Sequence, residues 1–249
     1  MTASDPDGRA PLEASLARQL ISRGSLQDGS FLERVRAIPG LAVRSDRELE
    51  ASLDETLAAR PAGGPVWLFG YGSLMWNPAF SYVERRKGTL RGWHRQFCMW
   101  MRLGRGTPEQ PGLTLALDRG GTTHGVAFRL AQGEERAELL LVWRREMFRD
   151  AYRARWVTLA TDEGPVRAIT LVVNREHDEY AAGLGEHEIV EHLATARGPL
   201  GSSAEYLFET LAHLEELGLR DGRLERVRQS LVERLQCSRK LRSGAGSAS

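Results

Sequence analysis

Residues 66–75 read VWLFGYGSLM, a short apolar run that passes directly into a glycine-containing loop. Valine, tryptophan and phenylalanine favour a buried β-strand. Gly70 and Gly72, in contrast, each lose more conformational entropy on folding than any other residue type. Such a loop is expected either where a tight turn needs positive φ angles or where bare backbone must approach a ligand. The stretch therefore predicts a strand followed by a loop with one of these two roles.

Short β-rich runs continue beyond this point and are separated by turn signals and helical patterns. The runs are LTLALD (113–118), HGVAFRL (124–130), WVTLAT (156–161) and VRAITLVVN (166–174). Turns are predicted at RGG (119–121) and DEG (162–164). Helices are predicted over 133–149, over 202–218 with a capping box of Ser202 and Glu205, and over 221–236. Strands and helices do not alternate strictly, so we expect an α+β fold with a mixed or antiparallel sheet.

Residues 1–64 predict a helical N-terminal extension. PLEASLARQLI (11–21) places three leucines on one helix face, and Ser45 followed by Glu48 forms a second capping box. We expect this extension to be packed on a catalytic domain at 65–236, with a flexible C-terminal tail at 237–249. A loosely attached extension is the alternative.

The bulk composition argues against several classes of protein. The 34 basic and 33 acidic side chains leave a net charge of +1, which gives no electrostatic basis for binding nucleic acid or an anionic membrane. Two cysteines, Cys98 and Cys237, are too few for a disulfide framework or a structural zinc site. The polar N-terminus lacks the apolar core of a signal peptide. We therefore expect a cytoplasmic protein.

Familiar cofactor and catalytic motifs do not fit the sequence. In GYGSLM the third glycine of a dinucleotide fingerprint is replaced by Met75, and no Gly-Lys-Ser/Thr of a P-loop follows. His187 and His192 are five residues apart, which does not align them on a helix, so with Glu188 they favour a solvated helix face over a metal site. Cys98, in the apolar stretch RQFCMWM, favours a core thiol over a nucleophile. We expect chemistry that needs no metal, no cofactor and no covalent nucleophile.

One glutamate of the helix predicted at 133–149 falls on its apolar side. Leu139, Val142, Trp143 and Glu146 follow the spacing i, i+3, i+4, i+7 of a single stripe. A carboxyl group in that position must pair, take a raised pKa, or lie at the mouth of a cleft. Glu146 is therefore either a functional carboxyl or a helix-end glutamate that reaches solvent or pairs with a buried arginine. Arg144 and Arg145 are expected to point away from this stripe.

The other glutamates of this helix are Glu134, Glu135 and Glu138. Most glutamates on amphipathic helices are solvated, and we expect the same of all three.

With these elements in place, the chain resembles the ChaC family of γ-glutamylcyclotransferases. The resemblance depends on separated stretches that appear in the family's order: VWLFGYGSLMWNPAF (66–80), LRGWHRQFCMWMRLGRGTPEQPGLTLALDRGG (90–121), GVAFRL (125–130), WRREM (143–147), RWV (155–157), LVVNREHDEY (171–180) and ARGPLGSSAEYLFET (196–210). It implies a small mixed β-barrel wrapped by helices. It also implies cleavage of a γ-glutamyl amide, typically that of glutathione, to 5-oxoproline and cysteinylglycine.

The resemblance also implies roles for particular residues. Glu146 of WRREM takes the position of the catalytic carboxylate, which would move a proton from the substrate's amine to the leaving nitrogen. The substrate-binding residues would be Gly70, Tyr71, Gly72, Ser73, Leu74, Met75, Tyr180, Tyr206 and Arg102. The partner is a small γ-glutamyl molecule, with no cofactor. For the two tyrosines ordinary packing remains the alternative, and for Arg102 and Arg105 a solvated loop.

Two other functions stay open at this point. The enzyme could act on other γ-glutamyl amines or amino acids, or the chain could be a non-catalytic module that regulates a partner. An intact loop and Glu146 favour the enzymes, because a binding module has no need of a proton-transferring carboxyl.

Overall fold

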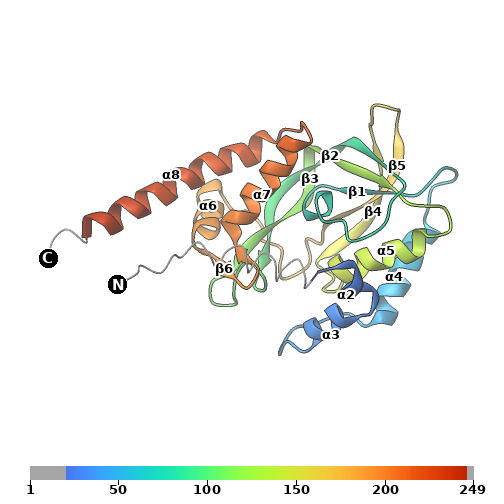
Figure 1. Ribbon diagram of the computed structural model, residues 1–249, viewed down its shortest axis with the longest axis horizontal. Helices are drawn as coiled ribbons and strands as arrows, with labels where there is room; N and C mark the ends of the chain where they lie inside the picture. The colour runs from blue at the N-terminus through green and yellow to red at the C-terminus, as the bar shows by residue number, and fades with distance from the viewer. Residues whose placement is uncertain (1–20, 246–249) are drawn as a thin grey trace. The chain divides into compact units, whose positions relative to one another are not determined.

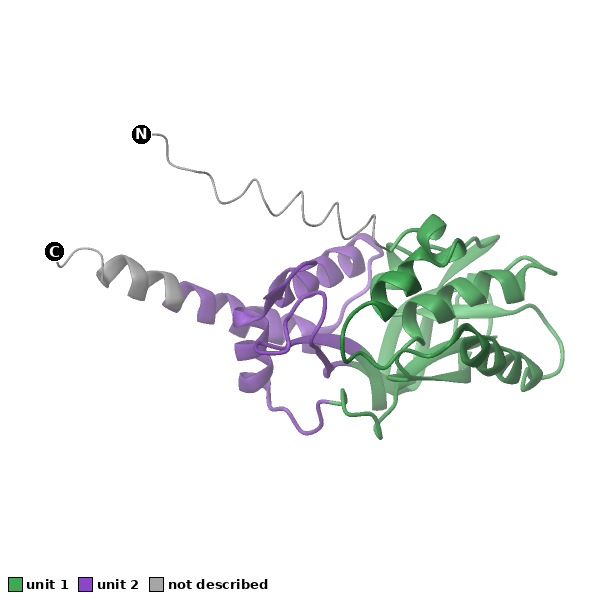
Figure 2. Cartoon of the chain, turned by 90° about the horizontal axis from the view of Figure 1, so that it is seen from below, with its two compact units in different colours: residues 1–95, 116–180 green, residues 96–115, 181–249 purple. Residues whose placement is uncertain are grey.

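The structure, a computed structural model, describes residues 21–245 (Figure 1). The chain divides into two compact units (Figure 2). Unit 1 contains the described residues up to Arg95 together with 116–180, and unit 2 contains 96–115 and the residues from Ala181 onward. The predicted helix at 11–21 lies almost wholly outside the described residues. No helix among residues 21–245 is long and apolar enough to cross a membrane.

A five-stranded mixed sheet is the central element of the fold. Its strands are, in spatial order, β2 (Glu84–Met101), β3 (Gly112–Arg129), β1 (Trp67–Gly70), β5 (Val166–Val173) and β4 (Tyr152–Leu159). Strand β1 pairs antiparallel with β3 and parallel with β5, and β5 pairs antiparallel with β4. All four residues of β1 are buried, which explains why its sequence is a continuous apolar run.

The sheet curls so that its two edges meet. Thr89 of β2 and Ala160, directly after β4, exchange two backbone hydrogen bonds of 2.9 and 3.0 Å. Inside this curl lie Trp67, Phe69, Leu117 and Leu159, all 2% exposed or less. The expected α+β fold with a small mixed barrel is confirmed in this form, a sheet that curls into a half-barrel with helices packed on it.

Two strand predictions were wrong in extent. RGG (119–121) does not end a strand, because β3 runs without interruption from Gly112 to Arg129. Gly120 and Gly121 have φ angles of 95° and 69°, and glycine allows a long strand to bend at such points without losing its partner. Strand β2 was not predicted, because its first half is rich in arginine and has no regular apolar alternation.

The N-terminal part of unit 1 contains three helices, of which the first and third pack on helix α5 (Glu135–Glu146). They are α2 (Arg23–Gln27), α3 (Ser30–Arg36) and α4 (Asp46–Ala58), and the predicted capping box of Ser45 and Glu48 opens α4. Trp143 Nε1 of α5 donates to Ser52 Oγ of α4 at 2.8 Å. The predicted extension is therefore attached to the helix that ends at Glu146.

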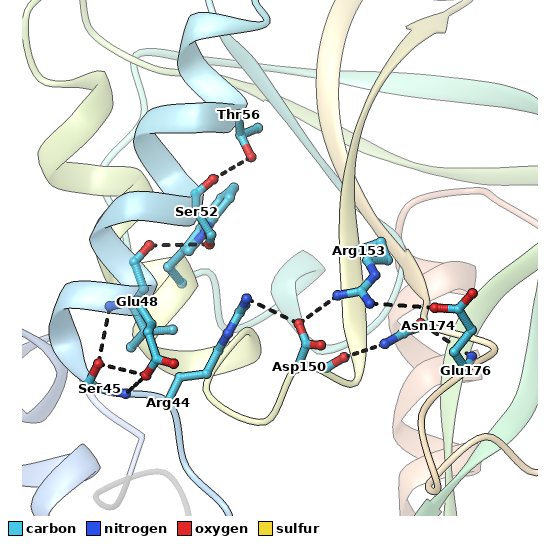
Figure 3. Close-up of polar contacts among 11 residues, drawn as sticks. Arg44, Ser45, Glu48, Ser52, Thr56, Asp150, Arg153, Asn174 and Glu176 are labelled. Carbon is cyan, nitrogen blue, oxygen red and sulfur yellow. Dashed lines mark hydrogen bonds and ion pairs between the residues drawn. The ribbon is translucent and has the colours of Figure 1, made fainter.

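A second attachment lies just after α5 (Figure 3). The Arg44 N–H donates to the Phe148 carbonyl at 2.8 Å, and the Arg44 guanidinium lies 3.2 Å from the Asp150 carboxylate. Asp150 also accepts from Arg153 of β4 at 2.7 Å and has a positive φ of 60°. These contacts connect the extension to the turn that carries the chain from α5 into the sheet.

Unit 2 is mainly helical. Besides the end of β2 and the start of β3, its elements are α6 (Glu186–Thr195), the short strands β6 (Arg197–Gly198) and β7 (Gly201–Ser202), α7 (Ser203–Glu216) and α8 (Gly222–Ala245). The capping box of Ser202 and Glu205 is present at the start of α7, as predicted. Helix α8 continues to Ala245, beyond the end predicted at residue 236.

Candidate active site

The loop after β1 forms one short turn of 3₁₀ helix, η2 (Ser73–Met75). Neither Gly70 nor Gly72 has a positive φ, and that of Gly72 is −134°, so the alternative of a turn with glycine in the left-handed region is wrong. Gly70 instead permits close packing: a Cβ added there would lie 3.2 Å from Leu74 Cβ and 3.2 Å from the Phe128 ring. The first glycine therefore lets the loop fold back directly onto the sheet.

The hydrogen bonds of this loop leave its first N–H groups without a partner inside the turn. Met75 N–H donates to the Gly72 carbonyl and Asn77 N–H to the Ser73 carbonyl, both at 2.9 Å. The opening N–H groups of a helical turn, here those of Ser73 and Leu74, have no acceptor within it. Successive backbone N–H groups of this kind can bind a carboxylate or an oxyanion.

Glu146 is the last residue of α5 and is partly accessible, with 19% of its side chain exposed. The stripe of Leu139, Val142 and Trp143 is buried as predicted. Glu146 pairs with Arg145, whose Nε lies 2.8 Å from Glu146 Oε1. Of the possibilities open for this carboxyl, the structure shows two together: Glu146 pairs with a buried arginine and remains partly accessible to solvent.

Arg145 also holds the glycine-containing loop. Its Nη2 donates to Ser73 Oγ at 2.7 Å, and its Nη1 donates to the Asn77 carbonyl. Only 6% of the Arg145 side chain is exposed. The expectation that Arg145 points away was therefore wrong: one guanidinium joins the two segments that carry the predicted catalytic and binding residues. Residues i and i+1 of a helix do not normally face each other, so helical spacing gave no signal for the pairing.

Glu138 is buried rather than solvated, which corrects a second expectation for this helix. It is 6% exposed, it receives two hydrogen bonds of 2.6 Å from Arg23 of α2, and it accepts the Ser81 N–H at 2.7 Å. The Arg23 hydrogen bond, opposed by burial, holds the pKa of Glu138 below its ordinary value. Glu134 is exposed as expected, and Glu135 is half-buried.

Tyr71 is fixed through its backbone. Arg95, only 2% exposed, donates from Nε to the Tyr71 carbonyl and from Nη2 to the His124 carbonyl, both at 2.6 Å. The Tyr71 side chain is itself buried, at 8% exposure. The Arg95 guanidinium of β2 therefore holds the backbone of the loop at Tyr71.

The hydroxyl of Tyr180, which was predicted to bind substrate, is hydrogen-bonded to a residue of unit 1. It donates to Asp118 Oδ2 at 2.9 Å, and Arg175 donates to Asp118 Oδ1 at 2.7 Å. Burial favours a raised pKa for Asp118, but the Arg119 N–H, Arg175 and Tyr180 together hold that pKa below its ordinary value.

The predicted residues of unit 2 are Tyr206, Arg102 and Arg105. Tyr206 of α7 is buried with its ring edge against Phe97, and the Arg105 guanidinium lies 5.5 Å from the Tyr206 ring centre. Arg105 also donates to Glu209 at 2.6 Å, so its charge is already paired. Arg102 is half-exposed and makes no hydrogen bond or ion pair with any residue in the described range.

The residues tested as a metal site or a nucleophile lie away from the loop in sequence and have other contacts. His187 and Glu188 are exposed on α6, while His192 packs edge-on against Trp100, with ring centres 4.7 Å apart. Cys98 is a fully buried thiol, as predicted. Within residues 21–245, no three His, Cys, Asp or Glu side chains are grouped so that they could hold a metal ion.

Curated proteins similar to this chain are named as cyclotransferases. The glutathione-specific gamma-glutamylcyclotransferase of Escherichia coli K12 is 44% identical over 206 residues, which cover 82% of this chain and 89% of that protein. The glutathione-specific gamma-glutamylcyclotransferase 1 of Rattus norvegicus is 32% identical over 75% of this chain and 90% of its own. The Escherichia coli match covers 82% of this chain, whereas residues 66–249 make up less than three quarters of it. The match therefore includes part of the N-terminal extension.

A solved structure and a family model agree with this similarity. The crystal structure of a glutathione-specific gamma-glutamyl cyclotransferase from yeast superposes with a TM-score of 0.60 at 18% identity, over 69% of this chain and all of that one. At this identity the likeness concerns the fold alone. The model of the ChaC-like protein family matches residues 66–234, more than half of the chain. This chain therefore belongs to the ChaC-like protein family.

Proposed function

We propose that this chain is a γ-glutamylcyclotransferase that converts glutathione to 5-oxoproline and cysteinylglycine. The observation that carries the proposal is the Arg145 guanidinium, which joins Ser73 of the loop to the Glu146 carboxylate. Arg145 thereby holds the loop that we propose to bind a charged head group, together with a partly exposed carboxyl, in one cluster of unit 1. The names of the similar proteins from Escherichia coli and rat supply the substrate class.

The reaction needs the substrate chain to curl back on itself. The α-amine of the γ-glutamyl group attacks its own γ-carbonyl carbon, so a C–N bond forms and closes a five-membered ring. Holding the α-carboxylate fixes this geometry, and such orientation can supply a large part of the rate enhancement. In our proposal the N–H groups at the start of η2 and the Ser73 hydroxyl bind that carboxylate.

In our proposal Glu146 then accepts and donates the protons of the reaction. The α-ammonium gives a proton to the Glu146 carboxylate, and the free amine attacks the carbonyl. The bond to the cysteine nitrogen breaks as that nitrogen takes the proton back from Glu146. The attacking nitrogen still carries one proton more than the ring amide needs, and Glu146 passes this second proton to the released amine, which leaves as an ammonium ion. One carboxyl thus acts first as a base and then as an acid, without any covalent intermediate on the protein.

The direct test is to incubate the full-length protein with glutathione and to measure both products by mass spectrometry. We expect 5-oxoproline and cysteinylglycine in equal amounts. Turnover of γ-glutamyl amino acids with glutathione left intact would assign the related activity. The absence of any product from glutathione and from a panel of γ-glutamyl amines would refute the enzyme in favour of a binding module.

A further inference from the structure

We infer that Arg145 is a positioning residue that sets the hydrogen-bonding roles of both Ser73 and Glu146. The inference rests on the proposed function, because it assigns a role in the same reaction. Arg145 is nearly inaccessible, with 6% of its side chain exposed, so it does not present its charge to solvent. It acts on the side chains of Ser73 and Glu146, which its guanidinium contacts.

The first consequence concerns Ser73. A guanidinium has only donors, whereas a hydroxyl has one donor and two acceptor positions. Because Arg145 Nη2 donates to Ser73 Oγ at 2.7 Å, the oxygen is an acceptor in this contact and its own O–H is left to donate elsewhere. Arg145 thereby makes Ser73 a donor, which is the role that a substrate carboxylate or carbonyl oxygen requires.

The second consequence concerns Glu146. Arg145 Nε lies 2.8 Å from Oε1, while Oε2 makes no hydrogen bond or ion pair with any residue among 21–245. The guanidinium plane therefore fixes the carboxyl group through one oxygen. The other oxygen is left to exchange the proton with the substrate nitrogen.

The third contact fixes the guanidinium itself. Arg145 Nη1 donates to the Asn77 carbonyl, directly beyond η2. The planar fork of arginine thus makes two hydrogen bonds to the loop segment and an ion pair with Glu146, about seventy residues away in sequence. A lysine carries the same charge but lacks this fork, so charge alone is not expected to replace Arg145.

The preceding residue provides a matched control. Arg144 is also partly buried on α5, and its Nη1 donates to the carbonyls of Leu26 and Gln27 at 2.7 and 3.0 Å. It contacts helix α2 of the N-terminal extension, and among residues 21–245 it makes no hydrogen bond or ion pair with the loop or with Glu146. Arg144→Ala should therefore cost stability without altering the turnover number of the folded enzyme.

The experiment compares Arg145→Ala, Arg145→Lys, Arg144→Ala and Glu146→Gln for melting temperature, kcat and KM with glutathione. We expect Arg145→Ala to lower kcat about 10²-fold, the scale of loss that follows a misplacement of about 1 Å. Guanidinium ion at millimolar concentration should restore part of that kcat, relative to an equal concentration of sodium chloride. Arg145→Lys should stay at least about tenfold below wild type.

Each outcome decides a different claim. Wild-type kcat in a folded Arg145→Ala or Arg145→Lys protein overturns the inference. The inference is also overturned if guanidinium ion raises the kcat of Arg144→Ala as much as it raises that of Arg145→Ala. If Arg145→Ala does not fold, Arg145→Lys decides alone by the same criterion. Full activity in Glu146→Gln would instead refute the proposed proton transfer, whereas an inactive Glu146→Gln beside fully active Arg145 variants would refute only the positioning role.

Discussion

Arg23 of α2 and Glu138 of α5 form a two-pronged ion pair, with both nitrogen–oxygen distances at 2.6 Å. The glutamate is buried and the arginine is partly exposed. Glu138 also receives the Ser81 N–H, just beyond the segment that Arg145 holds. The N-terminal extension is thus fastened to the helix that ends at Glu146 and to the chain following the loop.

Removal of Arg23 should therefore destabilise the protein. In Arg23→Ala the buried Glu138 carboxylate keeps one backbone donor and loses its counter-charge. We expect a loss of roughly 1–3 kcal/mol in the free energy of unfolding, measured by urea denaturation. Arg36→Ala, which removes an exposed ion pair with Asp46, is the control and should cost less than about 1 kcal/mol. Equal losses in the two variants would contradict the prediction.

The same pair predicts how stability depends on pH. The Arg23 hydrogen bond, opposed by burial, lowers the pKa of Glu138 from its ordinary 4.5. A carboxyl whose pKa is lower in the folded state stabilises that state above its unfolded pKa, and the stabilisation is lost as pH falls through the folded pKa. The gap in unfolding free energy between wild type and Glu138→Gln should be constant above pH 6 and narrow below about pH 4.5. A gap that stays constant down to pH 3 would exclude this linkage.

The turn after α5 gives a further prediction about the extension (Figure 3). Arg44 is bound there through its N–H to the Phe148 carbonyl and through its guanidinium to Asp150. Arg44→Ala leaves the backbone contact and removes the charged one. We expect a melting temperature lower by a few degrees, since about 1 kcal/mol corresponds to roughly 2–4 °C in a chain of this size. The kcat of the folded variant should be unchanged, and a fall in kcat without a change in melting temperature would contradict a structural role.

The sequence supported the elements whose signals are local. The capping boxes at Ser45 and Ser202 and the stripe of Leu139, Val142 and Trp143 were predicted correctly, because each depends on residues within one or two helical turns. The long strand β2 was not predicted, because its first half is rich in arginine and has no regular apolar alternation. A strand of that kind is recognised by its partner rather than by its own pattern.

The site was predictable only in part for a related reason. The loop was proposed by resemblance, and Glu146 by both helical spacing and resemblance. Their link through Arg145, which lies next to Glu146 at the end of a helix, was not predicted. Glu138 was wrongly predicted to be solvated, because its partner Arg23 lies 115 positions away in the sequence. Neither contact leaves a periodic signal in the chain, so local reasoning expected Glu138 to be solvated and Arg145 to point away from the apolar stripe.

The packing of the loop can be tested at Gly70. An added methyl group would lie 3.2 Å from both Leu74 Cβ and the Phe128 ring, closer than ordinary van der Waals contact. Gly70→Ala should therefore push η2 away from the sheet and raise KM for glutathione, while the protein stays folded. Gly133→Ala is a control for the general cost of replacing glycine, since Gly133 has a positive φ of 88° and open space around it. An unchanged KM in Gly70→Ala would show that the loop tolerates the shift.

The last prediction concerns Glu146 as the group that transfers the proton. Glu146→Gln keeps the size of the side chain and leaves an oxygen that can accept from Arg145 Nε, but the amide cannot carry the proton from the amine to the leaving nitrogen. Loss of acid–base catalysis should lower kcat by about 10²–10⁴-fold. KM should change little, because the loop rather than this carboxyl binds the substrate head group in our proposal.

The control for this variant is Glu134→Gln, an exposed glutamate just before the same helix, which should keep wild-type kcat. Melting temperatures show whether both variants are folded before the rates are compared. A folded Glu146→Gln protein with near wild-type kcat would remove Glu146 from the mechanism. Glu138 would be a poor replacement, because its carboxylate is buried and both of its oxygens already accept from Arg23. The proton would then have to move through the substrate's own groups or through water at the loop.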